Sequence, residues 1–187
     1  MLWPLCASSQ SLSKKKGGEN KDVVKEPIKF IGSRLVRESD QERPVVRSPE
    51  DAAFFLHERI ADGLDREIFG VICLSPAGHV NHCEIVSVGT VESALADPRA
   101  VYKAALLSNA TSVILFHTHP TTELKGPSLD DLKVTVRMKA AGDLMEVKLL
   151  DHLIINDDGW ISLKAIANGE DLELEDFCRN KVEEEEK

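Results

Sequence analysis

Short apolar runs, separated by polar segments that carry helix-start signals, form the main pattern of this chain. The runs Ile68–Leu74 and Val113–Phe116 are continuously apolar, which is typical of strands buried on both faces. Val80–Thr90 follows a turn at Ser75–Gly78 and is predicted to return as the second strand of a hairpin. Val147–Ile155 predicts a further stretch of strand.

Three helices are predicted between these strands, each from the residue that starts it. Ser48 and Asp97 are each followed by proline, and both are therefore typical N-cap residues. The helix after Asp97 should end near Asn109 and lead directly into the Val113 strand, so that strand is expected to run parallel to a neighbour. The third helix begins at Ser128, and Gly142 is predicted to end it.

Two histidines stand at the end of the second apolar run. His117 and His119 are two residues apart, and side chains with that spacing on a strand point to the same side. Pro120 cannot continue a β-ladder, so the chain is expected to turn there. Two nitrogen ligands on one side of a rigid strand end make half of a metal site.

Ser128 and Asp131 supply candidates for the other half. Their spacing, S-x-x-D at a helix start, is similar to a capping box. One interpretation is that Asp131 only caps the helix, which explains the serine and the aspartate but leaves the two histidines without a role. We prefer a metal site, because the histidine pair, the proline after it, the buried strand before it and the S-x-x-D segment occur together.

Composition narrows the functional classes. With 187 residues, 42% hydrophobic and 29% charged, the chain can bury a sizeable core and is ordinary for a soluble protein. Its net charge of −9 argues against a dedicated nucleic-acid surface, which needs clustered lysine and arginine. No apolar run approaches membrane-spanning length.

The cysteines and the first residues predict a compartment. Cys6, Cys73, Cys83 and Cys178 are scattered without a C-x-x-C pair, as expected for reduced thiols. The apolar start Met1–Cys6 is too short for a secretory signal and lacks its basic flank. We therefore expect a cytoplasmic protein.

The two ends of the chain differ in composition from its centre. Residues 1–32 are rich in serine, lysine and glycine in their middle part and are predicted to be a disordered arm, with an edge strand suggested over Ile28–Val36. One globular domain is predicted over residues 33–166. Residues 167–187, which include Glu183–Glu186, are predicted to be an acidic tail.

The pattern H-x-H-P followed by P-S-x-x-D resembles the JAMM motif of JAB/MPN metallopeptidases, in particular their RadC-like branch. The similarity extends from about Ser33 to Lys164. Segments in RadC-like order are Ser48-Pro-Glu-Asp-Ala, Asp65-Arg-Glu67, Val88-Gly-Thr90, Asp97-Pro-Arg99, Asn109-Ala110 and Leu150-Asp-His152. One departure is the loop from Pro120 to Pro127, which is one residue longer than usual. The resemblance implies an α/β fold, a mixed sheet flanked by helices in the cytidine-deaminase-like arrangement.

The resemblance also implies a function: a zinc-dependent hydrolase of the metallopeptidase type that cleaves a peptide or isopeptide bond with zinc-activated water. The implied ligands of Zn²⁺ are His117, His119 and Asp131, with water in the fourth position. Glu67 matches the catalytic base, which takes a proton from that water and passes it to the leaving amine. Ser128 matches the residue that donates a hydrogen bond to the developing oxyanion. The substrate would be a peptide or protein.

Other residues that could carry chemistry receive structural interpretations. Rivals for the base are Glu50, Glu58, Glu84 and Glu92. His79, His82 and Cys83 are interpreted as hairpin surface, because no second cluster of matching spacing completes a zinc site. By resemblance, the pair Asp151–His152 lies beside the core rather than on the metal.

Two further functions stay open. RadC-like proteins carry a DNA-repair label, so the alternative is a DNA-associated accessory factor without peptidase activity. A metal-free scaffold ranks last, because all three ligands are present. A deaminase is excluded, since P-C-x-x-C is absent and deaminase zinc sites need it. We expect neither nucleic acid nor a membrane as partner, and the sequence leaves the oligomeric state open.

The charge balance leads to a first prediction. With a net charge of −9, the protein should bind duplex DNA weakly, and moderate salt should abolish the binding, because affinity for phosphate depends on released counterions. Fluorescence anisotropy with labelled duplexes over a salt series measures this. A tight, sequence-selective complex at physiological salt would contradict the prediction and favour the accessory factor.

Overall fold

The computed structural model describes residues 43–59, 67–89, 96–119, 124, 126–156, 159–170 and 172–185. The arm predicted over residues 1–32 and the strand suggested over Ile28–Val36 lie outside these residues. The described residues contain five helices and five strands. In chain order they are α1 (Pro49–His57), β1 (Ile68–Leu74), β2 (Val80–Val88), α2 (Pro98–Leu107), β3 (Ser112–Thr118), α3 (Leu129–Leu144), β4 (Lys148–Asn156), β5 (Gly159–Ser162), α4 (Leu163–Gly169) and α5 (Leu174–Glu185).

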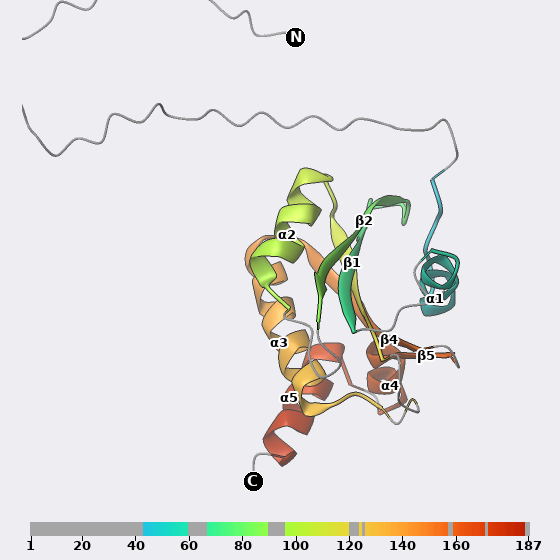
Figure 1. The fold of residues 1–187 in the computed structure, drawn as a ribbon. Helices are drawn as coiled ribbons and strands as arrows, with labels where there is room; N and C mark the ends of the chain where they lie inside the picture. Colours follow the sequence, from blue (N-terminus) through green and yellow to red (C-terminus); the bar gives the residue numbers. More distant parts are fainter. Residues whose placement is uncertain are drawn as a thin grey trace, which may run out of the picture. The chain divides into compact units, whose positions relative to one another are not determined.

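The strands form one mixed sheet in the order β2-β1-β3-β4-β5. The central strand β3 pairs antiparallel with β1 and parallel with β4, and β2 and β5 pair antiparallel at the two ends (Figure 1). The predicted fold class, a mixed sheet flanked by helices, is confirmed. The parallel neighbour expected for the strand that carries the histidines is β4, which follows it through α3.

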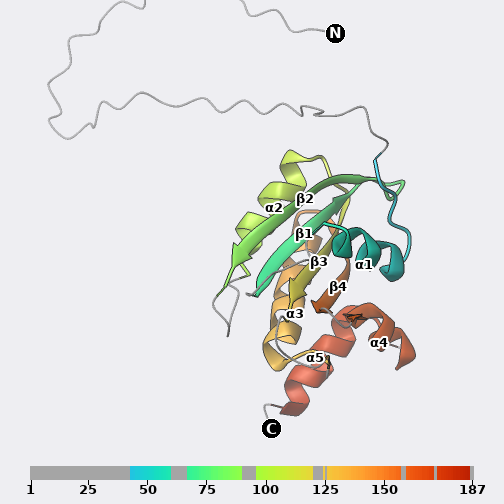
Figure 2. The same ribbon diagram turned by 45° about the vertical axis from the view of Figure 1, so that its right-hand side comes forward.

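Helices cover both faces of the sheet, so β1 and β3 are buried along their whole length. Val71 and Leu115 belong to the core that α2, α3, α4 and α5 cover, whereas Ile72 and Ile114 belong to the core on the side of α1. Figures 1 and 2 show α1 on one side of the sheet and α2, α3 and α5 on the other. Each such buried aliphatic side chain contributes about 1.5–3 kcal/mol relative to exposure.

The helix starts lie where the sequence predicts them. The Asp51 backbone N–H donates to Ser48 Oγ at 3.2 Å, and the Ser48 N–H donates to Asp51 Oδ2 at 3.1 Å, which completes a capping box for α1. Asp97 caps α2 by accepting from the Arg99 backbone N–H at 2.9 Å. These side chains satisfy N–H groups that have no partner within the helix.

The sequence predicted that Gly142 ends the third helix. This prediction is wrong, because α3 continues to Leu144. The Tyr102 hydroxyl donates to the Met138 carbonyl at 2.6 Å and lies directly over Gly142. A Cβ at Gly142 would collide with that hydroxyl and with the Val147 carbonyl. The helix ends instead before Glu146, which has a positive φ of 56°. Gly142 is therefore a packing residue between α2 and α3.

The segment predicted as an acidic tail, residues 167–187, contains helix α5, which packs on α3. Three of its residues at helical spacing are buried: Leu174, Phe177 and Cys178. Lys139 of α3 and Glu175 of α5 form an ion pair at 3.6 Å. The many acidic residues concealed this short apolar stripe, which is enough to hold a helix against a neighbour.

The three described cysteines are free thiols, as expected from their spacing. Burial raises the pKa of Cys73 to about 11 and the pKa of Cys83 and Cys178 to about 12. These thiols therefore stay protonated and are poor nucleophiles.

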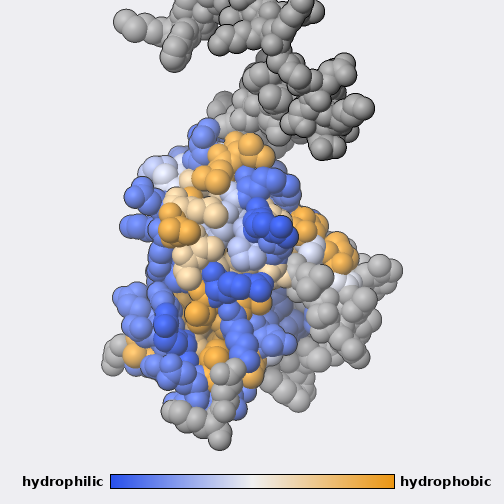
Figure 3. Space-filling model, turned by 90° about the vertical axis from the view of Figure 1, so that its left-hand side faces the viewer, coloured by the Kyte–Doolittle hydropathy of each residue, from blue (hydrophilic) through white to orange (hydrophobic). Residues whose placement is uncertain are grey.

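Figure 3 shows the side on which α2, α3 and α5 lie, where patches of apolar surface occur among hydrophilic side chains. Leu106 and Leu107 near the end of α2 and Leu144 at the end of α3 are exposed. Exposed apolar side chains of this kind are common on folded proteins. None of the helices in the described ranges is long and apolar enough to cross a membrane.

The contact between α2 and α3 can be tested with Gly142→Ala. The added methyl group must displace Tyr102 or the chain at Val147, so the free energy of unfolding should fall by about 1–3 kcal/mol, as is usual for overpacking. Urea denaturation measures the change. Gly169→Ala is the matched control, because nothing lies within 4 Å of a Cβ there. A Gly142→Ala protein as stable as wild type would contradict the prediction, because the contact between α2 and α3 would then accept the methyl group without cost.

Candidate metal centre

Strand β3 directs the two histidines toward α3. Its odd-numbered residues Val113 and Leu115 belong to the core under α3, and His117 continues the same alternation. His119 lies just beyond the strand, but its backbone N–H still donates to the Ile155 carbonyl of β4 at 2.8 Å. The backbone therefore remains tied to the sheet at both histidines.

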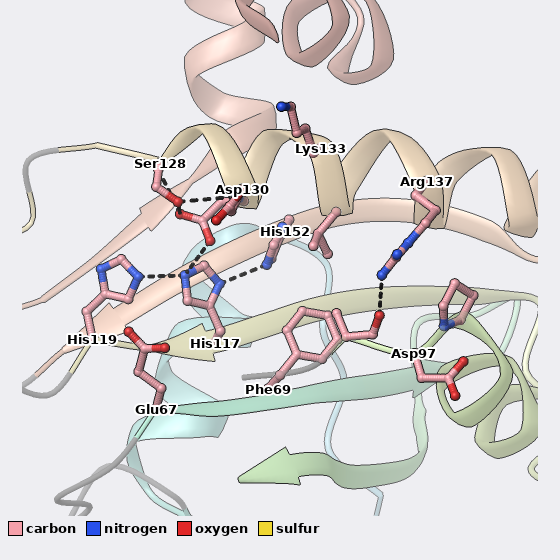
Figure 4. Close-up of a pocket in the computed structure, with 14 residues that line it drawn as sticks. Glu67, Phe69, Asp97, His117, His119, Ser128, Asp130, Lys133, Arg137 and His152 are labelled. Carbon is pink, nitrogen blue, oxygen red and sulfur yellow. Dashed lines mark hydrogen bonds and ion pairs between the residues drawn. The ribbon is translucent and has the colours of Figure 1, made fainter. Parts of the chain in front are cut away.

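The side chains of His117, His119 and Asp131 form one group, and Figure 4 shows the two histidine rings side by side below the start of α3. His117 Nε2 lies 2.8 Å from His119 Nε2 and 3.1 Å from Asp131 Oδ1. One ligand atom from each of the three residues lies within 4.8 Å of the others. The structure thus brings together the three residues predicted as metal ligands, from β3, the segment after it and α3.

Asp131 both caps the helix and faces the histidines. Its Oδ2 accepts from the Ser128 backbone N–H and from Ser128 Oγ, each at 2.7 Å, while Oδ1 faces His117. The Asp131 backbone N–H donates to Ser128 Oγ at 3.2 Å. The two interpretations of S-x-x-D are therefore compatible, because each carboxylate oxygen serves one of them. The positive end of the α3 dipole favours the ionised carboxylate.

A buried polar chain stands behind His117. His117 Nδ1 lies 2.9 Å from His152 Nε2 on β4, and His152 Nδ1 lies 2.7 Å from Thr135 Oγ1 on α3. The sequence placed His152 beside the core by resemblance but did not bring Thr135 into the site. The only signal for Thr135 was its position one helical turn after Asp131, which places both on one face of α3.

Burial keeps the imidazoles neutral. It lowers the pKa of His117 to about 4 and the pKa of His152 to about 3, because a charged ring loses its hydration. Burial acts to raise the pKa of Asp131, but His117 and the hydrogen bonds from Ser128 outweigh it, so the pKa lies below its usual value. Neutral imidazoles and an ionised carboxylate are the forms that bind a metal.

The donor set fits a divalent metal ion. Nitrogen ligands at about 2.1 Å in tetrahedral geometry are separated by about 3.4 Å. The separations here are 2.8 Å between the histidine nitrogens and 3.1 Å from His117 to Asp131, shorter than that value by about 0.6 and 0.3 Å. All three ligand atoms lie within 4.8 Å of one another, so side-chain rotations would let His117, His119 and Asp131 hold one ion.

The three residues line a pocket of about 680 Å³. Its lining residues include Glu67, Phe69, Asp97, Pro98, His117, His119, Ser128, Asp131, Val134, Arg137 and His152. Glu67 stands just before β1, where its carbonyl accepts from the Gly89 N–H at 2.8 Å. Figure 4 shows its carboxylate directed toward the rings of His117 and His119. Arg137 reaches across the pocket and donates to the Ala96 carbonyl.

The remaining candidate residues lie elsewhere. His82 is exposed on β2, 3.1 Å from Glu84, and does not belong to a metal-binding group. Among the described rivals for the base, Glu50, Glu58 and Glu84 do not line the pocket. Glu92 lies outside the described residues. Of the acids proposed as the base, the part of the chain that the structure describes places only Glu67 at the pocket.

A mixed sheet with two histidines at the end of its central strand and an aspartate at the start of the next helix defines a JAB-type domain with a candidate metal site. The family model of the RadC-like JAB domain matches residues 46–169. This chain therefore belongs to the RadC-like JAB domain family.

Relatives support the assignment. The chain is 40% identical over 134 residues to a UPF0758 protein of Shouchella clausii. The matched region covers 72% of this chain and 57% of that protein. It is 38% identical over 159 residues to a UPF0758 protein of Rubrobacter xylanophilus. Here the matched region covers 84% of this chain and 69% of that protein. The chain thus spans less than two thirds of the length of the first of these relatives.

The geometry predicts about one divalent metal ion per chain. Protein purified without added metal and then incubated with Zn²⁺ should retain about one equivalent after dialysis, because three ligand atoms converge. His119→Ala should lose most of it, as measured by elemental analysis. His82→Ala is the matched control, since His82 is an exposed histidine outside the group, and it should bind normally. A wild-type protein that stays metal-free would contradict the prediction.

Proposed function

We propose that this chain is a zinc-dependent hydrolase that cleaves an amide bond, in a peptide or an isopeptide linkage. The observation that carries the proposal is the convergence of His117 Nε2, His119 Nε2 and Asp131 Oδ1 on the wall of a pocket that also presents Glu67 and Ser128. Membership of the RadC-like JAB family supports the choice of amide chemistry.

We propose zinc as the metal. Two imidazole nitrogens and one carboxylate oxygen are a donor set of catalytic zinc sites, which keep a fourth position open. When bound, zinc lowers the pKa of a water ligand to about 7 and polarises a carbonyl group. His117, His119 and Asp131 would hold the ion at the pocket wall, where a substrate carbonyl can approach.

We propose Glu67 as the general base. Its carboxylate points toward the two histidine rings from just before β1 (Figure 4), and Glu67 lines the same pocket as the three candidate ligands. In the proposed reaction it takes a proton from the attacking water and delivers it to the nitrogen of the leaving amine. The carboxylate is then ionised again and ready for the next cycle.

The proposed role of Ser128 is to stabilise the negative charge that develops on the carbonyl oxygen. Its hydroxyl lies 2.7 Å from Asp131 Oδ2, and its backbone N–H donates to the same oxygen at 2.7 Å. Because the N–H alone keeps Asp131 Oδ2 bonded, the hydroxyl can turn its hydrogen toward the pocket. Donors of this kind stabilise an oxyanion best when they are held in place beforehand.

A peptide or protein remains the proposed substrate class, and the cytoplasm the expected location. The net charge of −9 gives the alternative, a DNA-associated accessory factor, no electrostatic support.

Glu67 and Asp131 should respond differently when each loses its charge. In Glu67→Gln, amide cleavage should fall by about 10²-fold or more, the scale of general-base catalysis, while zinc content stays near that of wild type. In Asp131→Asn, the zinc itself should be lost or weakened, because a neutral amide is a poor ligand. A panel of peptides and isopeptide-linked proteins supplies the substrate, and elemental analysis supplies the zinc content.

Glu58→Gln is the matched control, since Glu58 is an exposed glutamate that does not line the pocket. It should leave both activity and zinc unchanged. Zinc loss in Glu67→Gln would make Glu67 a ligand, and full activity in that variant would remove it as the base. No cleavage of any panel member by the zinc-loaded wild type would contradict the proposed function.

A further inference from the structure

Thr135 lies where a buried hydroxyl group can join two hydrogen bonds. It is fully buried on α3, and its Oγ1 lies 2.7 Å from the Asp131 carbonyl oxygen and 2.7 Å from His152 Nδ1. A carbonyl oxygen can only accept, and a threonine in a helix commonly donates to the carbonyl four residues earlier. With its hydrogen on that bond, Thr135 Oγ1 presents a lone pair to His152.

Hydrogen counting along the chain gives the state that metal binding requires. A metal bound at His117 Nε2 occupies that nitrogen's lone pair, so the one hydrogen of the neutral ring is on Nδ1. His117 Nδ1 therefore donates to His152 Nε2, 2.9 Å away. The hydrogen of the neutral, fully buried His152 must then be on its own Nδ1, and Thr135 Oγ1 accepts it.

The three hydrogen bonds form one directed chain. It begins at a ligand on β3, passes through β4, and ends at the backbone carbonyl of Asp131, which is itself a ligand on α3. Every donor in it has an acceptor. Cys178 also contacts Thr135, but a thiol is only a weak donor or acceptor and cannot replace the hydroxyl group.

We propose that Thr135 is a positioning residue for the metal centre: through His152, its hydroxyl holds His117 in the orientation and tautomer that offer Nε2 to the metal. The inference rests on the metal site of the proposed function, although it does not require that the bond cleaved be an amide. It assigns a role in metal affinity to a residue that touches neither metal nor substrate.

Removing the hydroxyl group should weaken the metal-bound state more than the metal-free state. In Thr135→Val, the metal-bound tautomer buries the His152 Nδ1–H without an acceptor, whereas metal-free His152 can move its hydrogen to Nε2. A buried donor without an acceptor is the costlier of the two defects. Outer hydrogen-bond partners of metal ligands typically contribute about 10–100-fold in metal affinity, and a loss of that size is expected here.

The test compares Zn²⁺ affinity, measured by competition with a chromogenic chelator, in wild type, Thr135→Val and Thr135→Ser. Thr135→Val should bind Zn²⁺ at least about tenfold more weakly, and Thr135→Ser, which keeps the hydroxyl group, should bind like wild type. Ser108→Ala is the matched control. Ser108 has a buried hydroxyl group that donates to the Ala105 carbonyl at 3.1 Å, and it does not line the pocket. It should bind Zn²⁺ normally.

Histidine ¹⁵N NMR of the zinc-loaded wild type provides a second, independent readout. It should show hydrogen on Nδ1 of both His117 and His152, which a merely structural role of Thr135 would not require. The inference is overturned if His152 carries its hydrogen on Nε2, or if folded Thr135→Val binds Zn²⁺ as tightly as wild type. It is also overturned if Thr135→Ser is as weak as Thr135→Val. If Thr135→Val does not fold, the NMR result and Thr135→Ser still decide.

These results separate the two proposals. Normal Zn²⁺ binding by Thr135→Val overturns the role of Thr135 and leaves the hydrolase intact. A wild type that binds Zn²⁺ and shows the expected tautomers but cleaves no amide keeps the role of Thr135 and overturns the hydrolase. A wild type that binds no Zn²⁺ overturns both.

Discussion

Strand β3 is buried along its whole length and hydrogen-bonded to a neighbour on each side, so its position is determined more tightly than that of any segment at the edge of the sheet. The core on both faces packs against it, and the candidate metal centre begins at its end. A strand held in this way cannot shift without breaking two ladders. His117 therefore has a rigid support, which a metal site needs if its ligands are to keep their geometry.

The polar groups beneath the site are a cost that the fold has to offset. His117, His152 and Thr135 are buried in a core that is otherwise mostly apolar, and a buried polar group without a hydrogen-bond partner destabilises the folded state by about 1–3 kcal/mol. Here each is bonded to the next, and the chain ends on a backbone carbonyl. A connected network of this kind also links β3, β4 and α3, so the packing of the core and the placement of the ligands depend on one another.

Helix α5 shows how composition can conceal a structural role. Its sequence is strongly acidic, yet Leu174 and Phe177 are buried against the core that underlies the site. Because α3 carries Asp131 and Thr135, a helix packed on α3 restrains the element that supplies one candidate ligand and the hydroxyl group bonded to His152. The pocket in turn lies between α3 and the strand ends, where side chains from distant parts of the chain can face one substrate.

The sequence by itself determined the features that depend on near neighbours. Alternation along a strand places His117 and His119 on one side, and Ser48 and Ser128 cap their helices through residues three positions away; such effects act within about one turn or one strand. Only the tertiary structure decided what stands behind the ligands. His152 is 35 residues from His117, and no local pattern says that β4 will bring it there or that Thr135 will meet it. Gly142 is another example, because its need for a bare backbone comes from Tyr102 on a different helix. Contacts of this kind arise from the packing of whole elements, which periodicity along the chain does not record.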